Sequence, residues 1–540
     1  MKSSNQTMSD PVIERALISV SDKKGIVEIA RVLQDRNIEI FSTGGTKNHL
    51  DEASINVTDI ASYTEFPEMM GGRLKTLHPR VHGGILCRHD KPEELESMQA
   101  QGILKIPLII VNLYPFEETI AREDADLALA VENIDIGGPT MIRAAAKNYR
   151  FTTVVTSSEQ YAEVADQIQK QGATSLSLRK KLAFNAFEKT ASYDRAIATY
   201  LMEQKFSITD SHPTPQDEAP FPERIDLPLT RKLQLRYGEN PHQQAALYQC
   251  SDPEKDSLVA AEKLNGKELS FNNFLDLESA LQLVKLLPEP SAVVMKHNNP
   301  CGASSQSTLK QATENAFAGD PESAFGSVLG FNVEVDGETA EFLIGPNKFI
   351  EAIIAPSFHP EAIKILTTRP KWKHNVRLMQ TGPLQPSQGV QDLRSISGGI
   401  LIQEADNCID ESANWEVVTE NQPNADVMED LHFAWTVVRQ VKSNAIVVAK
   451  GKTLWGSGAG QMSRIDAVEI ALQKASEMAA NSVLASDAFF PFADSIAQAE
   501  KAGIQAIIQP GGSRRDAEVI AACNAHKISM IFTGTRHFKH

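Results

Sequence analysis

Residues 16–46 read ALISVSDKKGIVEIARVLQDRNIEIFSTGGT, and this stretch decides the fold expected for the first part of the chain. It starts with a short apolar run (ALISV), continues with an amphipathic stretch (GIVEIARVLQDR) and returns to a second apolar run (IEIF) before two glycines. A β-branched run, a segment of helical periodicity and another such run are typical of a strand, a helix and a parallel strand. The stretch therefore predicts a parallel α/β sheet, with the polar loops SVSDK and STGGT after two of its strands.

The same alternation continues on both sides of a proline-rich segment. Before it, IPLIIVNLY and TTVVT extend the α/β pattern to about residue 206. Residues 207–230 contain five prolines in a polar context that neither a helix nor a central strand tolerates. After it, AVVM, AIVVA, IQAIIQ and ISMIFTG indicate further strand–helix units, with a weak sign of internal duplication. We expect a first domain at 1–206, a linker at 207–230 and a second domain at 231–540.

The composition is that of an acidic, folded protein. The 540 residues exceed the size at which a single core keeps growing, and 42% of them are hydrophobic. The formal net charge of -16 opposes binding to nucleic acid and to anionic membranes, so anionic substrates require local basic pockets. The five cysteines form no CxxC pair, and the sequence shows no signal peptide and no apolar run of spanning length. We therefore expect a cytoplasmic protein with small-molecule substrates.

The polar loops of the first domain carry residue types that suit an anion or a developing oxyanion. STGGT could surround a phosphate with backbone amides at a helix N-terminus, and GGRLKTLHP concentrates donors between glycines and a proline. IDIGGPT begins a helix that RAAAKN continues, and NLYPF ends a strand with an amide and a phenol. Each loop also has a structural interpretation, because a glycine turn, a solvated loop or a capped strand end would show the same letters. The loops indicate a function only as a set.

As an ordered set, these segments resemble the inosine monophosphate (IMP) cyclohydrolase domain, which has a methylglyoxal-synthase-like α/β fold. The resemblance extends over residues 11–205. It implies that Lys75, Tyr114, Asp135 and Lys147 surround the cyclising base. Lys75 and Tyr114 would donate to an oxyanion, and Asp135 would orient or deprotonate an amide. The resemblance places these residues around the nucleotide: Ser19, Ser21, Lys23, Gly44, Gly45, Thr46, Arg73, Thr76, Asn112 and Gly137.

In the second domain, KHNNPCGAS (296–304) follows an apolar run and puts an imidazole beside an ammonium. A single histidine is more often structural than catalytic, so its context decides. LRYGENPHQ, LSFNNFLD, SAFG, SNAIVVAK, GSGAGQMSR, SDAFFPFAD and the terminal RHFKH follow one another as in the aminoimidazole carboxamide ribonucleotide (AICAR) transformylase family, which residues 231–540 resemble.

This second resemblance implies that Lys296, His297 and Asn444 are catalytic. His297 would be the base toward a weakly nucleophilic amine, Lys296 would stabilise the formyl oxyanion, and Asn444 would hold the geometry. The residues implied around the nucleotide and the folate are Arg236, Tyr237, Asn273, Phe325, Glu351, Arg464, Phe489, Phe492, Asp494, Arg536 and Phe538. Two local departures, Ser327 and Glu351, remove none of the proposed catalytic groups.

Other interpretations depend on single residues. A zinc deaminase site requires HxE and PCxxC, but two asparagines follow His297 and Cys301 has no second cysteine after it. A P-loop at GKT would require a glycine where Ile446 stands. A nucleotide sensor without turnover is the alternative, although binding alone does not require all the proposed catalytic groups.

The expected protein is a bifunctional α/β enzyme of purine synthesis. Its N-terminal domain would be methylglyoxal-synthase-like, and its C-terminal transformylase domain would consist of duplicated deaminase-like halves. The resemblance implies 10-formyltetrahydrofolate as the cosubstrate, AICAR as the acceptor, and cyclisation of formyl-AICAR (FAICAR) to IMP. It also implies a homodimer. We expect no zinc and no nucleic-acid or membrane partner, and a structural potassium ion would not be readable from the sequence.

Overall fold

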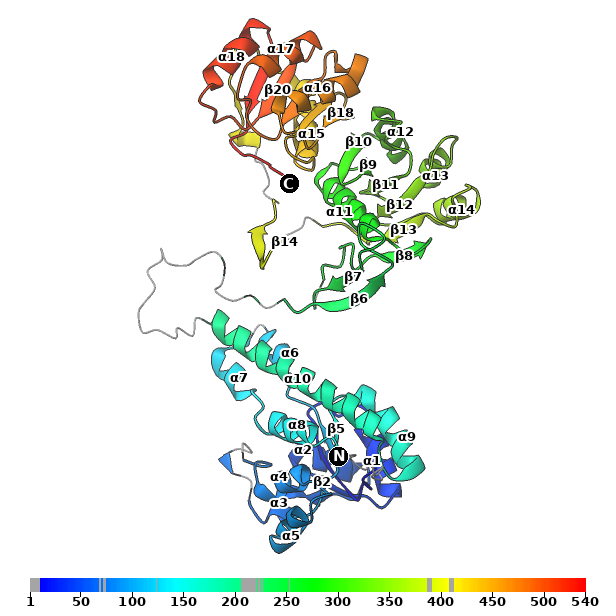
Figure 1. Cartoon of the computed structure of the whole chain (residues 1–540), viewed down its shortest axis with the longest axis vertical. Coiled ribbons are helices and arrows are strands. Elements are labelled where there is room, and N and C mark those ends of the chain that lie inside the picture. Colours follow the sequence, from blue (N-terminus) through cyan, green and yellow to red (C-terminus); the bar gives the residue numbers. More distant parts are fainter. Residues whose placement is uncertain are drawn as a thin grey trace, which may run out of the picture. The chain divides into compact units, whose positions relative to one another are not determined.

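The computed structural model describes residues 10–67, 69–70, 74–122, 124–204, 221, 225, 227–251, 253–385, 391–406 and 412–540. The chain divides into two compact units, Met1–Pro220 and Phe221–His540 (Figure 1). Most of the linker expected at 207–230 lies outside the described residues. None of the helices in the described ranges has the length and apolarity needed to span a bilayer.

The N-terminal unit contains a five-stranded sheet in which all neighbouring strands are parallel. The strand order β3-β2-β1-β4-β5 puts the first strand in the middle, which confirms the parallel α/β fold predicted for this part. The strands are β1 (Arg15–Ser19), β2 (Glu39–Ser42), β3 (Thr58–Asp59), β4 (Leu108–Val111) and β5 (Thr153–Val155). The helices are α1 (Ile26–Asp35), α2 (Gly44–Glu52), α3 (Ile60–Thr64), α4 (Pro79–Leu86), α5 (Pro92–Ala100), α6 (Phe116–Ile120), α7 (Leu127–Glu132), α8 (Gly137–Lys147), η2 (Ser158–Gln160), α9 (Tyr161–Gln171) and α10 (Leu176–Glu203).

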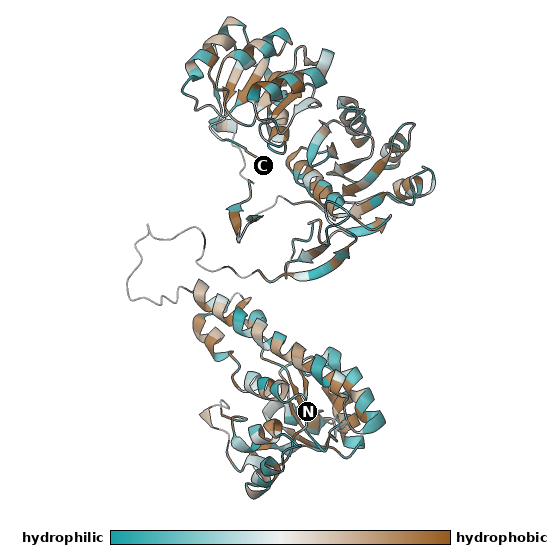
Figure 2. Ribbon diagram, in the orientation of Figure 1, coloured by the Kyte–Doolittle hydropathy of each residue, from teal (hydrophilic) through white to brown (hydrophobic). Residues whose placement is uncertain are grey.

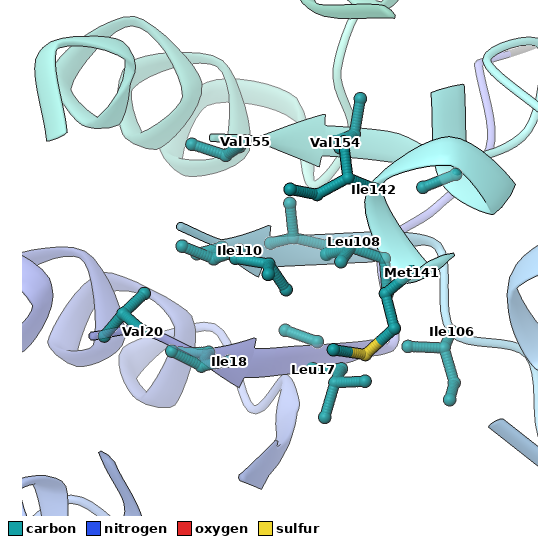
Figure 3. Close-up of a cluster of buried hydrophobic side chains, with 14 of the residues drawn as sticks. Leu17, Ile18, Val20, Ile106, Leu108, Ile110, Met141, Ile142, Val154 and Val155 are labelled. Atoms are coloured by element: carbon teal, nitrogen blue, oxygen red, sulfur yellow. The ribbon is translucent and has the colours of Figure 1, made fainter. Parts of the chain in front are cut away.

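Part of the core of this unit lies between its central strands and α8. Every residue of β4 is buried, as expected for a parallel strand covered on both faces. Figure 3 shows Leu17 of β1, Leu108 and Ile110 of β4, and Met141 and Ile142 of α8 gathered in one cluster. Burying a side chain of this size contributes about 1.5–3 kcal/mol. The packing therefore holds the strands and the N-terminal end of α8 in fixed positions.

The C-terminal unit contains two six-stranded sheets with the same topology. Their strand orders are β10-β9-β11-β12-β13-β8 and β18-β17-β19-β20-β21-β16. The first half contains β8 (Glu262–Asn265), α11 (Phe271–Leu286), β9 (Ser291–Lys296), β10 (Asn299–Ser305), α12 (Leu309–Gly319), β11 (Ser327–Phe331), α13 (Gly337–Leu343), β12 (Ile350–Ala355), α14 (Pro360–Thr368) and β13 (Arg377–Gln380). The second half contains β16 (Glu416–Val417), α15 (Ala425–Val438), β17 (Ile446–Ala449), β18 (Leu454–Gly458), α16 (Arg464–Ala475), η4 (Ser476–Ala479), β19 (Val483–Ser486), α17 (Asp494–Lys501), β20 (Ala506–Gln509), α18 (Asp516–Ala525) and β21 (Ser529–Phe532). The halves are therefore a structural duplication.

Short elements complete this unit. Two antiparallel ribbons pair β6 (Thr230–Leu235) with β7 (Ala245–Gln249), and β14 (Gln391–Ile396) with β15 (Gly399–Glu404). One 3-10 turn, η3 (Ser412–Asn414), precedes β16. Figure 2 shows that the strands of the large sheets are mostly hydrophobic, whereas their helices combine hydrophilic and hydrophobic residues. This distribution is that of sheets covered by amphipathic helices.

The strand–helix pattern predicted after AVVM and AIVVA is wrong at both places. In the structure β9 returns directly as the antiparallel strand β10, and β17 returns as β18. His297 and Asn298 form the turn between β9 and β10, with φ angles of 52° and 61°. Positive φ at both central residues is the requirement of a two-residue type I′ hairpin turn, and asparagine tolerates that conformation. His297 therefore lies at the tip of a hairpin.

Candidate active sites

A cavity of about 560 Å³ opens at the carboxyl edge of the parallel sheet in the N-terminal unit. Its wall includes the end of β1, the residues after β2 and the end of β4, because parallel strands deliver their following loops to one edge. The cavity brings together most of the residues predicted for the first domain: Ser19, Ser21, Lys23, Gly45, Thr46, Lys75, Thr76, Asn112, Tyr114, Asp135 and Gly137.

Asn112 and Thr46 hold the loop that follows β1. The Asn112 Oδ1 atom accepts from the Ser21 amide at 2.5 Å, and its Nδ2 donates to the Asp22 carbonyl at 2.8 Å. The Thr46 hydroxyl accepts from the Val20 amide at 3.1 Å and donates to the Val20 carbonyl at 2.9 Å. Since these polar atoms bond to the loop, the two residues shape the cavity around Ser21 and Lys23.

Two helices begin at the cavity, α2 at Gly44 and α8 at Gly137. A helix N-terminus presents backbone N–H groups and a partial positive charge, which favour an anion. Gly44 has a φ of +41°, and a Cβ atom there would lie 2.5 Å from the Lys75 Nζ atom. Lys75 therefore places its ammonium against the first turn of α2, and the positive φ explains why glycine stands at position 44.

Asp135 lies at the start of α8 in a partly dehydrated environment. Burial raises the pKa of its carboxyl group, although backbone N–H groups, including that of Gly138 at 2.8 Å, oppose the shift. The Asp135 amide donates to the Tyr193 hydroxyl at 2.8 Å, and that hydroxyl donates to the Asn133 carbonyl at 3.2 Å. Sequence reasoning missed Tyr193, because a tyrosine within the long helix α10 has the pattern of a core residue.

The other residues predicted for this site lie outside the cavity wall or outside the described residues. Lys147 is exposed at the last position of α8. It is ten residues beyond Gly137, which corresponds to about 15 Å along the helix axis. The structure therefore does not bring Lys147 to this cavity. Arg73 lies outside the described residues.

The hairpin turn of the C-terminal unit lines a second cavity, of about 260 Å³. Its wall is formed by Glu239, Asn272, Leu275, Asp276, His297 and Asn298. Lys296 precedes the turn, and its ammonium donates to the carbonyls of Phe325 and Gly326, both at 2.9 Å. The turn thus places an imidazole at a cavity and an ammonium at the SAFG loop.

Asp276 is a site residue that sequence reasoning missed. Its Oδ1 accepts from the Asn298 amide at 2.7 Å, which ties α11 to the hairpin turn. Burial raises the pKa of this carboxyl group, and the Asn298 amide and the charges of His297 and Lys296 oppose the shift. A signal was present, because Asn272 and Asp276 are four residues apart in LSFNNFLD and so share one helix face.

Asn444 precedes β17 and has partners for both ends of its amide. Its Nδ2 donates to the Gln461 carbonyl at 2.8 Å and to the Met462 carbonyl at 3.2 Å, and its Oδ1 accepts from the Arg464 guanidinium at 2.8 Å. The backbone amide of Lys442 donates to Asn299 Oδ1 at 3.0 Å. Because Asn299 directly follows the hairpin turn, this bond brings the segment of Asn444 beside the base of the His297 hairpin.

Known proteins match this chain along nearly its whole length. Residues 145–474 match the model of the AICARFT/IMPCHase bienzyme, and residues 25–140 match the MGS-like domain. The bifunctional purine biosynthesis protein PurH of Rhodopirellula baltica is 52% identical over 534 residues, which cover 99% of this chain and 100% of that protein. The PurH proteins of Persephonella marina (48% identical; 97% and 99% covered) and Bacillus subtilis (46%; 98% and 100%) are also similar.

The chain belongs to the AICARFT/IMPCHase bienzyme family. It is therefore a bifunctional enzyme of purine biosynthesis, a formyltransferase and a cyclohydrolase, which confirms the family, the fold class and the two activities predicted from the motifs. A formyltransferase of this family implies a folate-type formyl donor. These matches concern whole domains, so the assignment of individual residues rests on the geometry of the two cavities.

In this bienzyme, several residues predicted to bind the nucleotide or the folate are basic or aromatic side chains outside the wall of the second cavity. Arg236 stacks over the Tyr237 ring at 5.6 Å, in the loop that also carries Glu239. Arg536 stacks over Phe538 at 4.3 Å. The Ser443 amide donates to the Lys539 carbonyl at 2.9 Å and the Lys539 amide donates to the Ser443 hydroxyl at 3.2 Å, which ties the C-terminal segment to the neighbour of Asn444. The phenylalanines Phe325, Phe489 and Phe492 are exposed, at 57%, 39% and 48%.

Four other residues that were predicted to lie around the nucleotide or the folate form hydrogen bonds with neighbouring protein groups. Asn273 caps α11 through a reciprocal pair of bonds with Ser270. Glu351 accepts from Arg377 at 2.7 Å, and Asp494 accepts from the Ser495 amide at 2.7 Å. The buried Arg464 donates to Asn444, to the Ala445 carbonyl at 3.3 Å and to Asp487. The structure does not bring these residues into the wall of the His297 cavity.

Proposed function

We propose that the two cavities divide the two activities of this bienzyme. The cavity of the N-terminal unit would cyclise FAICAR to IMP. The cavity of the C-terminal unit would transfer the formyl group of 10-formyltetrahydrofolate to the exocyclic amine of AICAR. The observation that carries this division is the different chemistry of the two walls. One wall combines two helix N-termini with Lys75 and Asp135, and the other presents His297, whose neighbour in the chain, Lys296, directs its ammonium to the SAFG loop.

Cyclisation needs little more than orientation and charge stabilisation. The carboxamide nitrogen of FAICAR attacks the formyl carbon of the same molecule, so proximity supplies much of the rate. Asp135 would take the amide proton, since burial raises the pKa of its carboxyl group and makes it a stronger base than an ordinary aspartate. Lys75 and Tyr114 would donate to the oxyanion and protonate it to a hydroxyl. The hydroxyl would then take the proton held by Asp135 and leave as water, while the formamide nitrogen loses its proton to form the C=N bond of the new ring. The start of α2 and the loop held by Asn112 would bind the phosphate.

Formyl transfer needs a base and an oxyanion donor. The amine of AICAR attacks the formyl carbon, His297 takes the amine proton, and the N10 atom of the folate leaves as an amine that gains a proton. An ammonium has three N–H donors, and Lys296 directs two of them to the carbonyls of Phe325 and Gly326. The third would donate to the formyl oxygen. The cavity at the hairpin tip would admit the amine between His297 and Asp276.

The identity of the donor and the assembly state belong to the same proposal. A flat pterin suits the exposed rings of Phe325, Phe489 and Phe492, and a formyl group on N10 is already at the oxidation level that the product requires. We also propose a cytoplasmic homodimer, as the family resemblance implies. In the described part of the chain, no group of three or more His, Cys, Asp or Glu side chains is arranged to hold a metal ion.

A coupled assay on the purified full chain tests the division. AICAR and 10-formyltetrahydrofolate are supplied together, and tetrahydrofolate release and IMP formation are followed in the same sample. Both products should appear, and FAICAR supplied alone should give IMP without folate. Nucleotide binding without either product would support a nucleotide sensor and contradict the proposal.

A further inference from the structure

A buried carboxylate, that of Asp487, bonds to both chain neighbours of the proposed catalytic Asn444 but not to the Asn444 side chain. Asp487 follows β19 and is fully buried. Its Oδ2 accepts from the Ser443 hydroxyl, and its Oδ1 accepts from the Ala445 amide at 3.2 Å. These partners are the two residues that flank Asn444 in the chain. Asp487 thus holds the backbone on both sides of Asn444.

The same carboxylate also reaches the Asn444 side chain through an arginine. One nitrogen of the Arg464 guanidinium donates to Asp487 Oδ1, and another donates to Asn444 Oδ1 at 2.8 Å. The planar fork of a guanidinium fixes the angle between its two acceptors. The position of Asp487 therefore determines where Arg464 holds the amide oxygen.

The first half of the C-terminal unit, which has the same topology, shows that the fold itself does not require an ion pair at this position. Asn332 occupies the equivalent position after β11, and its Oδ1 accepts from the Ser291 amide at 2.7 Å, as Asp487 does from Ala445. The Asn332 amide then donates to backbone carbonyls, including that of Leu287 at 3.0 Å. A neutral side chain thus makes the same strand connection. A buried ion pair costs desolvation and is weak support for stability, so the charged form in the Asn444 half calls for another role.

The bonds of Asn444 show which atom can meet the substrate. Both N–H groups of its amide have carbonyl partners, Gln461 and Met462, whereas its oxygen accepts one bond and has a second lone pair. Asn444 therefore meets the substrate as a hydrogen-bond acceptor. An acceptor at this point would bind one N–H of the attacking amine and align its lone pair with the formyl carbon.

We propose that Asp487 is a positioning residue for formyl transfer, acting through Arg464 to hold the oxygen of Asn444 toward the attacking amine. This role rests on the function proposed above for the C-terminal site. Asp487→Asn keeps the size of the side chain and removes its charge. It should lower kcat for transfer about 10- to 100-fold, since small misplacements of a reacting group have such effects. The KM for AICAR and the cyclisation of supplied FAICAR should stay close to wild type.

A double-mutant cycle distinguishes positioning from general damage. If Asp487 acts through Asn444, Asp487→Asn should cause almost no further loss of kcat in an Asn444→Ala background. The matched control is Asp256→Asn, which removes a buried ion pair with Lys285 (2.8 Å) in the same unit. This control should leave kcat for transfer near wild type. If Asp487→Asn does not fold, Arg464→Lys decides by the same cycle, because one ammonium does not reproduce the fork that bridges Asp487 and Asn444.

The outcomes distinguish an error in the role of Asp487 from an error in the assignment of the C-terminal site. Losses that multiply in the double variant, or a kcat loss in Asp256→Asn equal to that in Asp487→Asn, would overturn the positioning role alone. Undiminished transfer by the Asn444→Ala variant would instead contradict the assignment of the C-terminal site.

Discussion

The two candidate sites differ in how the chain brings their residues together. In the N-terminal unit, every strand of the sheet points the same way, so the loops after β1, β2 and β4 meet at one edge without further specification. In the C-terminal unit, His297 lies on a hairpin turn of one half and Asn444 precedes a strand of the other half. A site of the first kind follows from local sequence, whereas one of the second kind depends on how two halves pack.

The largest expected effect tests the C-terminal site, where His297 lies on the hairpin turn. His297→Ala should lower kcat for formyl transfer about 100- to 10,000-fold, the usual range for loss of a general base, while nucleotide binding and cyclisation of supplied FAICAR continue. The rates of both reactions are measured with the same purified variant. His297→Gln is the control for shape, because glutamine keeps hydrogen bonding without basicity. Near-wild-type transfer by this variant would show that His297 is only a turn residue.

The next largest effect tests the N-terminal site, at the carboxyl edge of the parallel sheet. Lys75→Ala should slow cyclisation about 100-fold or more, as expected for loss of an oxyanion donor, while formyl transfer continues. FAICAR should therefore accumulate in the coupled assay, where chromatography detects it. Lys170→Ala removes an exposed lysine that pairs with Asp166 on α9 and should have no effect. Unchanged IMP formation in the Lys75 variant would remove Lys75 from the chemistry.

A smaller effect is expected in the pH dependence of cyclisation at the N-terminal site. Asp135 must be ionised to act as a base, and burial raises the pKa of its carboxyl group. Cyclisation should therefore fall on the acidic side at a higher pH than an ordinary aspartate would produce, with activity lost as the pH drops through the raised pKa. The profile of kcat against pH with FAICAR as substrate measures this limb. An acidic limb that persists unchanged in Asp135→Asn would assign it to another group.

The smallest expected effect concerns metals. Both mechanisms derived from the side chains use proton transfer and oxyanion stabilisation, so divalent metal chelators should leave both rates within about twofold of the untreated enzyme. The two rates are compared before and after dialysis against a chelator. If chelation abolished formyl transfer and added zinc restored it, the conclusion that His297 and Cys301 do not form a deaminase-type zinc site would be wrong.

The sequence by itself determined the α/β class and the family, and it predicted many of the residues that line the N-terminal cavity. Period-two and period-3.6 hydrophobicity is a local property, and parallel strands bring SVSDK, STGGT and NLYPF to one edge whatever the details of packing. The catalytic candidates at Lys296, His297 and Asn444 also came from motif order, although their spatial relation did not.

Only the tertiary structure decided which polar groups bind one another. The turn at His297 and Asn298 replaced an expected strand–helix connection, because backbone φ angles are not written in the hydrophobic pattern. Tyr193 and Asp487 reach Asp135 and Arg464 from segments 58 and 23 residues away along the chain, and Lys147 lies at the far end of its helix. Such contacts arise when buried polar atoms must find partners during packing, and no periodicity of the sequence records them.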